Sequence, residues 1–151
     1  MLKPSLTGLL LLSTAALLAA CGEPEDTRPG QPVKQRQQAF KEIIKSFEPM
    51  GVMLRKGSYE ADRFLAFAEK LHAARELPWR HFGADTNYPP TKAKAELWQQ
   101  PQQFEADKQA FLQASDALLA AAQSKDKARI QPAYDAVHES CKACHDRFKA
   151  R

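Results

Sequence analysis

The residues best suited to chemistry lie near the C-terminus, where Cys141, Cys144 and His145 form a Cys-X-X-Cys-His motif. Two thiols followed by an imidazole are typical of c-type haem attachment, in which the thiols form thioethers with the haem vinyl groups and the imidazole binds the iron. On a helix, residues three and four apart share a face, so all three side chains can point toward one macrocycle. The motif therefore predicts one covalent haem c, with His145 as the metal ligand.

Other uses of a Cys-X-X-Cys pair fit less well. A thioredoxin-like redox pair stands beside a βαβ pattern, and no such pattern surrounds these cysteines. A zinc site needs two more ligands at tetrahedral spacing, whereas the sequence has only one other cysteine, Cys21. A purely structural helical protein is a third interpretation, which a protein mass without haem would favour.

Residues 1–20 are typical of a secretory signal peptide. Lys3 precedes an apolar run that ends in small residues and is too short for a membrane-spanning helix. The segment Leu18-Ala19-Ala20-Cys21 resembles the lipobox of bacterial lipoproteins, which implies lipidation of Cys21. Because glycine rather than aspartate follows Cys21, the resemblance implies a periplasmic-facing lipid anchor in the outer membrane of a Gram-negative bacterium. Ordinary cleavage at an Ala-X-Ala-like site is the alternative.

Residues 21–32 are expected to form a lipid-anchored flexible tether. Residues 22–32 are polar and contain three prolines and two glycines. Such a stretch buries too little apolar surface to order itself, so we expect it to hold the folded part away from the bilayer.

Residues 33–151 have the composition of one all-α domain, because Ala, Lys, Gln, Glu and Leu are abundant and β-branched residues are scarce. Apolar residues recur every three or four positions and predict helices over residues 33–56, 59–76, 101–122 and 126–149. Two short connections and one long one favour an antiparallel four-helix bundle whose core can hold the haem.

Individual residues predict where these helices bend, start and stop. Pro49 and Gly51 predict a bend in the first helix, and Ser58 is the expected cap of the second. Pro132 predicts a kink in the last helix or a short turn before it. Residues 78–100 are rich in proline and are expected to form a long connection with one turn of helix near its end, a length consistent with wrapping a cofactor.

The sequence resembles the cytochromes c′ over residues 33–150. The resemblance rests on the C-terminal position of the haem motif and on four further segments, Arg36-Gln37-Gln38-Ala39, Leu77-Pro78-Trp79, Phe82-Gly83 and Glu96-Leu97-Trp98. It implies that His145 is the single protein ligand of the iron.

The resemblance also implies roles around the haem. Arg36 and Gln37 are expected to contact a haem propionate. Trp79 and Phe82 are expected to line the haem edge and distal pocket, with ordinary core packing as the alternative. Lys149 is expected to stand near the proximal face, the alternative being a lysine that only complements the helix dipole.

Phe40 distinguishes two functions within this resemblance. Low-spin electron-transfer relatives have a methionine here as the sixth iron ligand, whereas phenylalanine has no lone pair. The resemblance implies five-coordinate, high-spin iron with an apolar distal side that favours neutral diatomic gases, above all nitric oxide. We expect a gas-binding protein that limits nitrosative damage in the periplasm, rather than a true enzyme. The alternative is an electron-transfer cytochrome that serves a membrane oxidase or reductase.

Other candidate ligands are less suitable. Met50 and Met53 lie about 15 Å from Phe40 along the same helix and are expected in the core or on the surface. The histidines outside the motif are expected to be solvated or capping residues: His72, His81 and His138.

The net charge of +4 and the mixture of both signs along the helices predict solvated faces rather than a nucleic-acid surface. A redox partner is possible. The resemblance implies a homodimer through the first helix, with Val52 and Met53 as candidate contacts.

Overall fold

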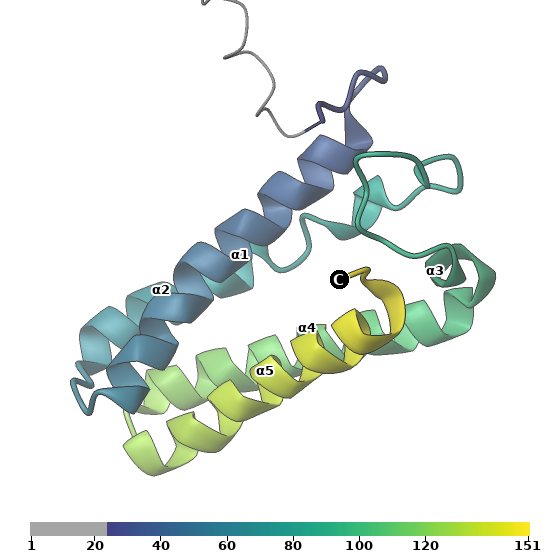
Figure 1. The fold of residues 1–151 in the computed structure, drawn as a ribbon. Coiled ribbons are helices and arrows are strands. Elements are labelled where there is room, and N and C mark those ends of the chain that lie inside the picture. Colours follow the sequence, from purple (N-terminus) through teal and green to yellow (C-terminus); the bar gives the residue numbers. More distant parts are fainter. Residues whose placement is uncertain (1–23) are drawn as a thin grey trace, which may run out of the picture.

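The structure, a computed structural model, describes residues 24–151 (Figure 1). Its helices are α1 (Pro32–Arg55), α2 (Ala61–Ala74), the 3-10 helix η1 (Trp79–His81), α3 (Glu96–Gln99), α4 (Pro101–Ser124) and α5 (Lys127–Phe148). The four long helices form the predicted antiparallel bundle, in which α1 packs on α2, α2 on α4, and α4 on α5. The predictions for residues 1–23, including the signal peptide and lipidation of Cys21, lie outside the described residues.

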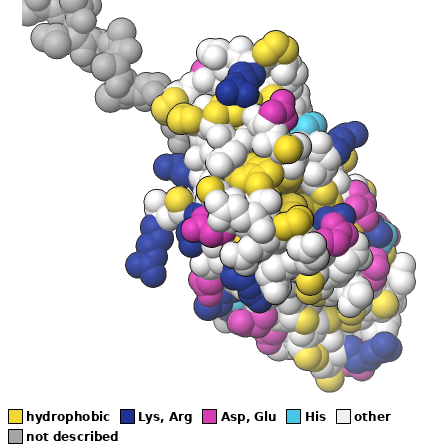
Figure 2. Space-filling model, turned by 90° about the vertical axis from the view of Figure 1, so that its right-hand side faces the viewer, with side chains coloured by type: hydrophobic (Ala, Val, Ile, Leu, Met, Phe, Trp, Pro, Cys, Tyr) yellow, Lys and Arg dark blue, Asp and Glu magenta, His cyan; other side chains and the backbone are white. Residues whose placement is uncertain are grey.

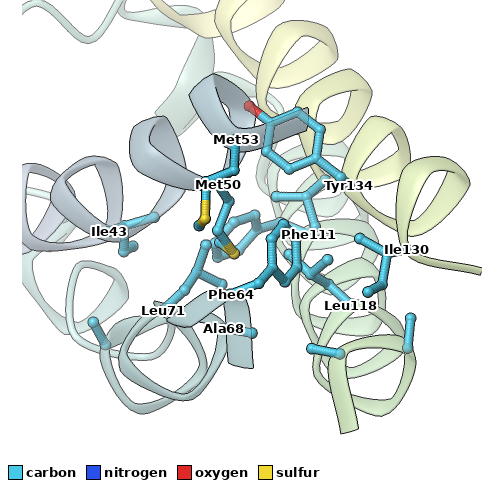
Figure 3. Packing of buried hydrophobic residues seen from close by; sticks show 14 of the residues in the cluster. Ile43, Met50, Met53, Phe64, Ala68, Leu71, Phe111, Leu118, Ile130 and Tyr134 are labelled. Atoms are coloured by element: carbon cyan, nitrogen blue, oxygen red, sulfur yellow. The ribbon is translucent and has the colours of Figure 1, made fainter. Parts of the chain in front are cut away.

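One apolar core joins the four long helices (Figure 3). Its fully buried large side chains include Met50, Phe64, Leu71, Leu118, Ile130 and Val137. Burial of a side chain of this size stabilises a fold by about 1.5–3 kcal/mol. Met53 is also in this core, at 4% exposure, so it cannot serve as the dimer contact expected from the sequence, whereas Val52 is 40% exposed.

Helices α1 and α5 meet at one end of the bundle and diverge toward the other (Figure 1). Where they meet, the ring of Phe47 stacks on Tyr134 with centroids 4.3 Å apart. Gly51 is buried beside the same tyrosine, where the absence of a side chain permits the close approach. Toward the opposite end, α1 carries Phe40 and α5 carries the haem motif.

The structure places the start of α2 later than expected, and it shows no separate turn before α5. Ser58 does not cap α2, because that helix begins at Ala61 and Glu60 is its N-cap, without a side-chain hydrogen bond. Helix α5 runs through Pro132 and is continuous from its first residue, where the Asp126 carboxylate accepts a hydrogen bond from Ala128 N. Pro132 is exposed there, so the carbonyl that its missing N–H leaves free can be hydrated.

Part of the expected tether is folded. Asp26 is 1% exposed, and its Oδ2 accepts hydrogen bonds from the backbone N–H groups of Val33 (2.9 Å) and Lys34 (3.2 Å). Its Oδ1 accepts a hydrogen bond from the Tyr88 hydroxyl (2.9 Å). These bonds satisfy two of the free N–H groups at the start of α1, so the domain begins at Asp26 rather than at residue 33.

The long connection between α2 and α4 is held against the C-terminus. Lys94 N donates to the Phe148 carbonyl and Ala150 N donates to the Lys92 carbonyl, both at 2.8 Å. This connection contains the predicted turn of helix as α3, and also η1, which was not predicted. Within residues 24–151, each helix is too short or too polar to cross a bilayer.

Candidate haem site

Helix α5 supplies the three residues of the haem motif from its last two turns. Cys141 and Cys144 are half-buried free thiols, and Cys141 packs against the apolar core. His145 is exposed beside them. The helical spacing that the sequence predicted is therefore present, with the two sulfur atoms set toward the interior.

The surroundings of these three groups favour their neutral forms by shifting their pKa values. Burial raises the pKa of the Cys141 thiol, and it raises that of Cys144 to about 11 with a further contribution from the negative charge of Asp107. Desolvation of the ring and the positive charge of Lys149 lower the pKa of His145. The imidazole is therefore neutral near pH 7, which is the form that binds a metal.

Six aromatic rings form a continuous cluster at the same end of the bundle, which we call the aromatic wall: Phe40, Trp79, Phe82, Phe104, Phe111 and Phe148. Trp79 is its centre, with the ring centroids of Phe40, Phe104 and Phe111 between 5.6 and 6.1 Å away. Figure 2 views this end of the bundle and shows apolar side chains gathered between charged ones.

The wall connects α1 to α5. The ring of Phe40 contacts Phe82 at a centroid distance of 6.3 Å, and Phe82 contacts Phe104 at 5.1 Å. Phe104 meets Phe148 edge to face at 5.9 Å, three residues after His145. Trp79 packs on the main core, as the alternative interpretation expected, and its role at the haem edge stays a prediction.

Arg36 holds the connection between α2 and α4 in place through hydrogen bonds. It is 3% exposed, and its Nη1 donates to the His81 carbonyl (3.0 Å) and the Thr86 hydroxyl (2.9 Å). Its Nη2 donates to the Thr86 carbonyl (3.1 Å) and the Thr91 hydroxyl. All four terminal N–H groups are thus engaged by protein oxygens. The expected contact between Arg36 and a haem propionate stays a prediction. It would have to use Nε of Arg36, or a propionate oxygen would have to replace one of these four acceptors.

Gln37 acts on the same connection, because its side-chain amide donates to the Pro90 carbonyl at 3.3 Å. Its expected propionate contact likewise stays a prediction. The Arg36 guanidinium also lies 4.7 Å from the ring centroid of Phe82, a cation–π contact that fixes this ring within the aromatic wall.

Lys149 lies near His145, but not on the same helical face as the four-residue spacing predicted. It is the C-cap of α5 with an extended backbone, and its N–H donates to the His145 carbonyl at 3.0 Å. It borders a pocket of about 470 Å³ that His145, Lys94 and Arg151 also line. Lys94 Nζ donates to the carbonyls of Asp146 and Arg147, which closes the end of the haem-bearing helix.

Sequence reasoning missed five residues that contribute to this site. Phe104, Phe111 and Phe148 lie in the predicted apolar stripes of their helices, so nothing in the pattern set them apart from core residues. Lys94 lies in the connection, whose path the sequence does not reveal. Asp107 did carry a signal, because it is an acidic residue between Phe104 and Phe111 on a buried helix face.

The other histidines lie elsewhere. His72 Nε2 contacts the Asp116 carboxylate at 2.8 Å on the surface of the α2–α4 pair, and His138 lies 3.6 Å from the Glu139 carboxylate. His81 is the last residue of η1 and accepts the Arg36 bond through its carbonyl. Met50 is in the core. None of these contacts involves Cys141, Cys144 or His145.

Comparison with known proteins agrees with this geometry. The family model described as Cytochrome C′ matches residues 31–149. The chain belongs to the cytochrome c′ family. It is 32% identical to a cytochrome c′ of Alcaligenes xylosoxydans over 82% of this chain and 97% of the relative, and 31% identical to that of Rubrivivax gelatinosus over 82% and 98%. It superposes on cytochrome c prime from Shewanella frigidimarina with a TM-score of 0.79 and 32% identity, covering 83% of this chain and 98% of the other.

Proteins of the cytochrome c′ family carry one covalently attached c-type haem, which is the cofactor of this chain. The residues present fit that group, because two free thiols and a neutral imidazole share one face of α5 where α1 and α5 diverge. Cys141 and Cys144 would hold it by thioethers and His145 would ligate its iron, which supplies a redox-active metal that can bind gases.

Proposed function

We propose that this cytochrome c′ binds nitric oxide at a five-coordinate haem iron in the periplasm and so limits nitrosative damage. Several solved structures similar to this chain are described as nitric oxide complexes of cytochrome c prime from Alcaligenes xylosoxidans. One of them, a ferrous arginine-to-lysine variant with bound NO, matches with a TM-score of 0.76 and 34% identity over 84% of this chain and 99% of the other.

The observation that carries this proposal is the position of Phe40. Its ring is half-buried and packs edge to face on Trp79 at 5.6 Å, within the aromatic wall. A phenyl ring has no lone pair for iron and no hydrogen-bond donor for an anion. Such surroundings favour a small neutral ligand, because burying an unpaired charge costs several kcal/mol.

Optical spectroscopy of the ferrous haem protein tests the proposal. We expect a high-spin spectrum that changes on addition of nitric oxide or carbon monoxide. Substitution of Phe40→Met introduces a thioether that can ligate iron, so we expect a low-spin spectrum and weaker gas binding by at least about tenfold, since each 1.4 kcal/mol of competing ligation is a factor of ten.

Phe47→Met is the matched control, because it makes the same change two turns along α1, where the ring stacks on Tyr134 rather than on the aromatic wall. Its spectrum should remain that of the unmodified protein. A low-spin spectrum before any substitution, unchanged by carbon monoxide, would contradict gas binding and support the electron-transfer alternative.

We further propose attachment to the outer membrane through lipid on Cys21, supported by the lipobox-like segment that ends at this residue. Because Asp26 belongs to the folded domain, the anchor is only five chain steps long, from Cys21 to Asp26. These five steps span at most about 17 Å. The anchor is therefore short, and the domain stays close to the bilayer.

A further inference from the structure

Asp107 is a buried acidic residue that neither the fold nor the gas site explains. It lies on the face of α4 that packs on α5, and it is 7% exposed. Its Oδ1 accepts a hydrogen bond from the Gln103 side chain at 3.0 Å. Its Oδ2 is buried and has no hydrogen-bond partner among the described residues. A carboxylate oxygen left unpaired in the interior is costly, so its presence calls for a reason.

Arg147 compensates the negative charge of Asp107 only in part. Arg147 Nη2 lies 3.5 Å from Oδ1, which is longer than the 2.7–2.9 Å of strong charge-assisted hydrogen bonds. The Arg147 side chain is 43% exposed, whereas that of Asp107 is 8% exposed. Water therefore screens the cation more than the anion, and a net negative field remains inside the bundle.

This field reaches the point of haem attachment. Arg147 is three residues after Cys144 on the same face of α5, so the contact with Arg147 brings Asp107 to the Cys144 side of that helix. A haem joined to the sulfur of Cys144 lies in the same field.

We propose that Asp107 is an internal counter-charge that lowers the reduction potential of the haem attached at Cys141 and Cys144. Uptake of one electron makes the haem site more negative by one unit, and a fixed negative charge nearby in a poorly hydrated interior opposes that change. Asp107 therefore favours the ferric state. The proposal depends on the haem and not on nitric oxide as its ligand.

Other charges near this position act less strongly on the haem. Glu105 and Lys108 on α4 pair with each other at 2.9 Å, and Glu105 is exposed. Asp146 on α5 is exposed and pairs with Lys142 at 2.6 Å. These groups are paired and in contact with water, which distinguishes them from the buried and unpaired Oδ2 of Asp107.

Spectroelectrochemical titration of the intact haem protein tests the proposal. Asp107→Asn keeps the size of the side chain and removes its charge. We expect its midpoint potential to rise, so that the ratio of ferrous to ferric haem at a fixed applied potential increases roughly three- to tenfold. Arg147→Gln removes the partial compensation and is expected to shift the potential the opposite way, by a smaller amount because this arginine is exposed.

Glu105→Gln is the matched control, since it removes one negative charge from the same helix at an exposed position and should leave the potential unchanged. Thermal unfolding is measured in parallel, because a purely structural Asp107–Arg147 contact would lower the Tm of both variants without moving the potential. That result, or equal shifts in Asp107→Asn and Glu105→Gln, would overturn the proposal. If Asp107→Asn fails to fold with haem, an unshifted potential in Arg147→Gln overturns it.

Discussion

The close approach of α1 and α5 depends on a single glycine. A Cβ atom added at Gly51 would lie 2.9 Å from Cζ of Tyr134 and would overlap the hydroxyl of that residue. Both are buried, so the helices must separate to accept it. We expect Gly51→Ala to destabilise the protein by about 1–3 kcal/mol, in the range for overpacked cores, as measured by urea unfolding of the haem protein.

The double variant Gly51→Ala with Tyr134→Phe separates this effect from a change in helix propensity. Removal of the hydroxyl relieves the most severe overlap and should restore part of the lost stability. Since alanine favours helices over glycine, a stability of Gly51→Ala equal to or above that of the unmodified protein would show that the helices yield without cost.

The residue types predicted the chemistry of the site better than they predicted the residues that hold its helices and connection in place. The haem motif could be identified because its chemistry follows from a short local pattern, whereas the role expected of Phe40 rests on the resemblance to the cytochromes c′. The role of Gly51 could not, because a bend and a close helix contact leave the same signature in the sequence. The same holds for Arg36, whose partners His81, Thr86 and Thr91 follow 45 to 55 residues later.

At the scale of elements, Asp26 joins the start of α1 to the connection between α2 and α4. Its carboxylate accepts bonds from the N–H groups of Val33 and Lys34 and from the Tyr88 hydroxyl. We expect Asp26→Asn to lower the Tm of the haem protein by several degrees, because the neutral amide cannot accept all of these bonds. Glu25→Gln, which alters only an exposed pair with Lys34, should leave the Tm unchanged.

The effect of Asp26 depends on pH. Burial acts to raise the pKa of its carboxyl group, but the hydrogen bonds from Tyr88 and the backbone outweigh this, and the pKa is lowered. The ionised form therefore stabilises the fold above the ordinary pKa of an aspartate, and that contribution is lost as the pH falls through the lowered value. The difference in Tm between Asp26→Asn and the unmodified protein should shrink below about pH 4. A difference that stays constant down to pH 2 would contradict this role.

The apolar periodicity predicted the four long helices, and each of their ends lies within two residues of its predicted position. The segment before α1 was misjudged because its composition is that of a linker, yet one carboxylate finds partners 7, 8 and 62 residues away. Contacts between distant segments are not visible in local composition, and they decide whether such a stretch is ordered.

In the whole molecule, the folded N-terminal segment and the haem site lie at the same end of the bundle. The start of α1, the connection and the C-terminus gather there, while the turns between α1 and α2 and between α4 and α5 lie at the other end (Figure 1). With lipid on Cys21, as proposed, a chain reaching at most about 17 Å to Asp26 holds the haem end toward the membrane. Nitric oxide is small and uncharged, so it can cross the lipid phase and reach this end of the bundle.

Neutron reflectometry of the lipidated protein on a supported bilayer measures this arrangement. We expect protein density to begin within about 17 Å of the headgroups, since that is the longest span the five chain steps allow. Insertion of ten Gly and Ser residues after Gly22 should widen the gap, because such a linker behaves as a flexible coil of roughly 5–6 Å × √n. Cys21→Ser should not bind the bilayer at all. Binding by this variant would contradict the lipid anchor. A wide gap between bilayer and protein without the insertion would contradict only the orientation. It would mean that Asp26 does not keep its hydrogen bonds and that the flexible tether is longer than five chain steps.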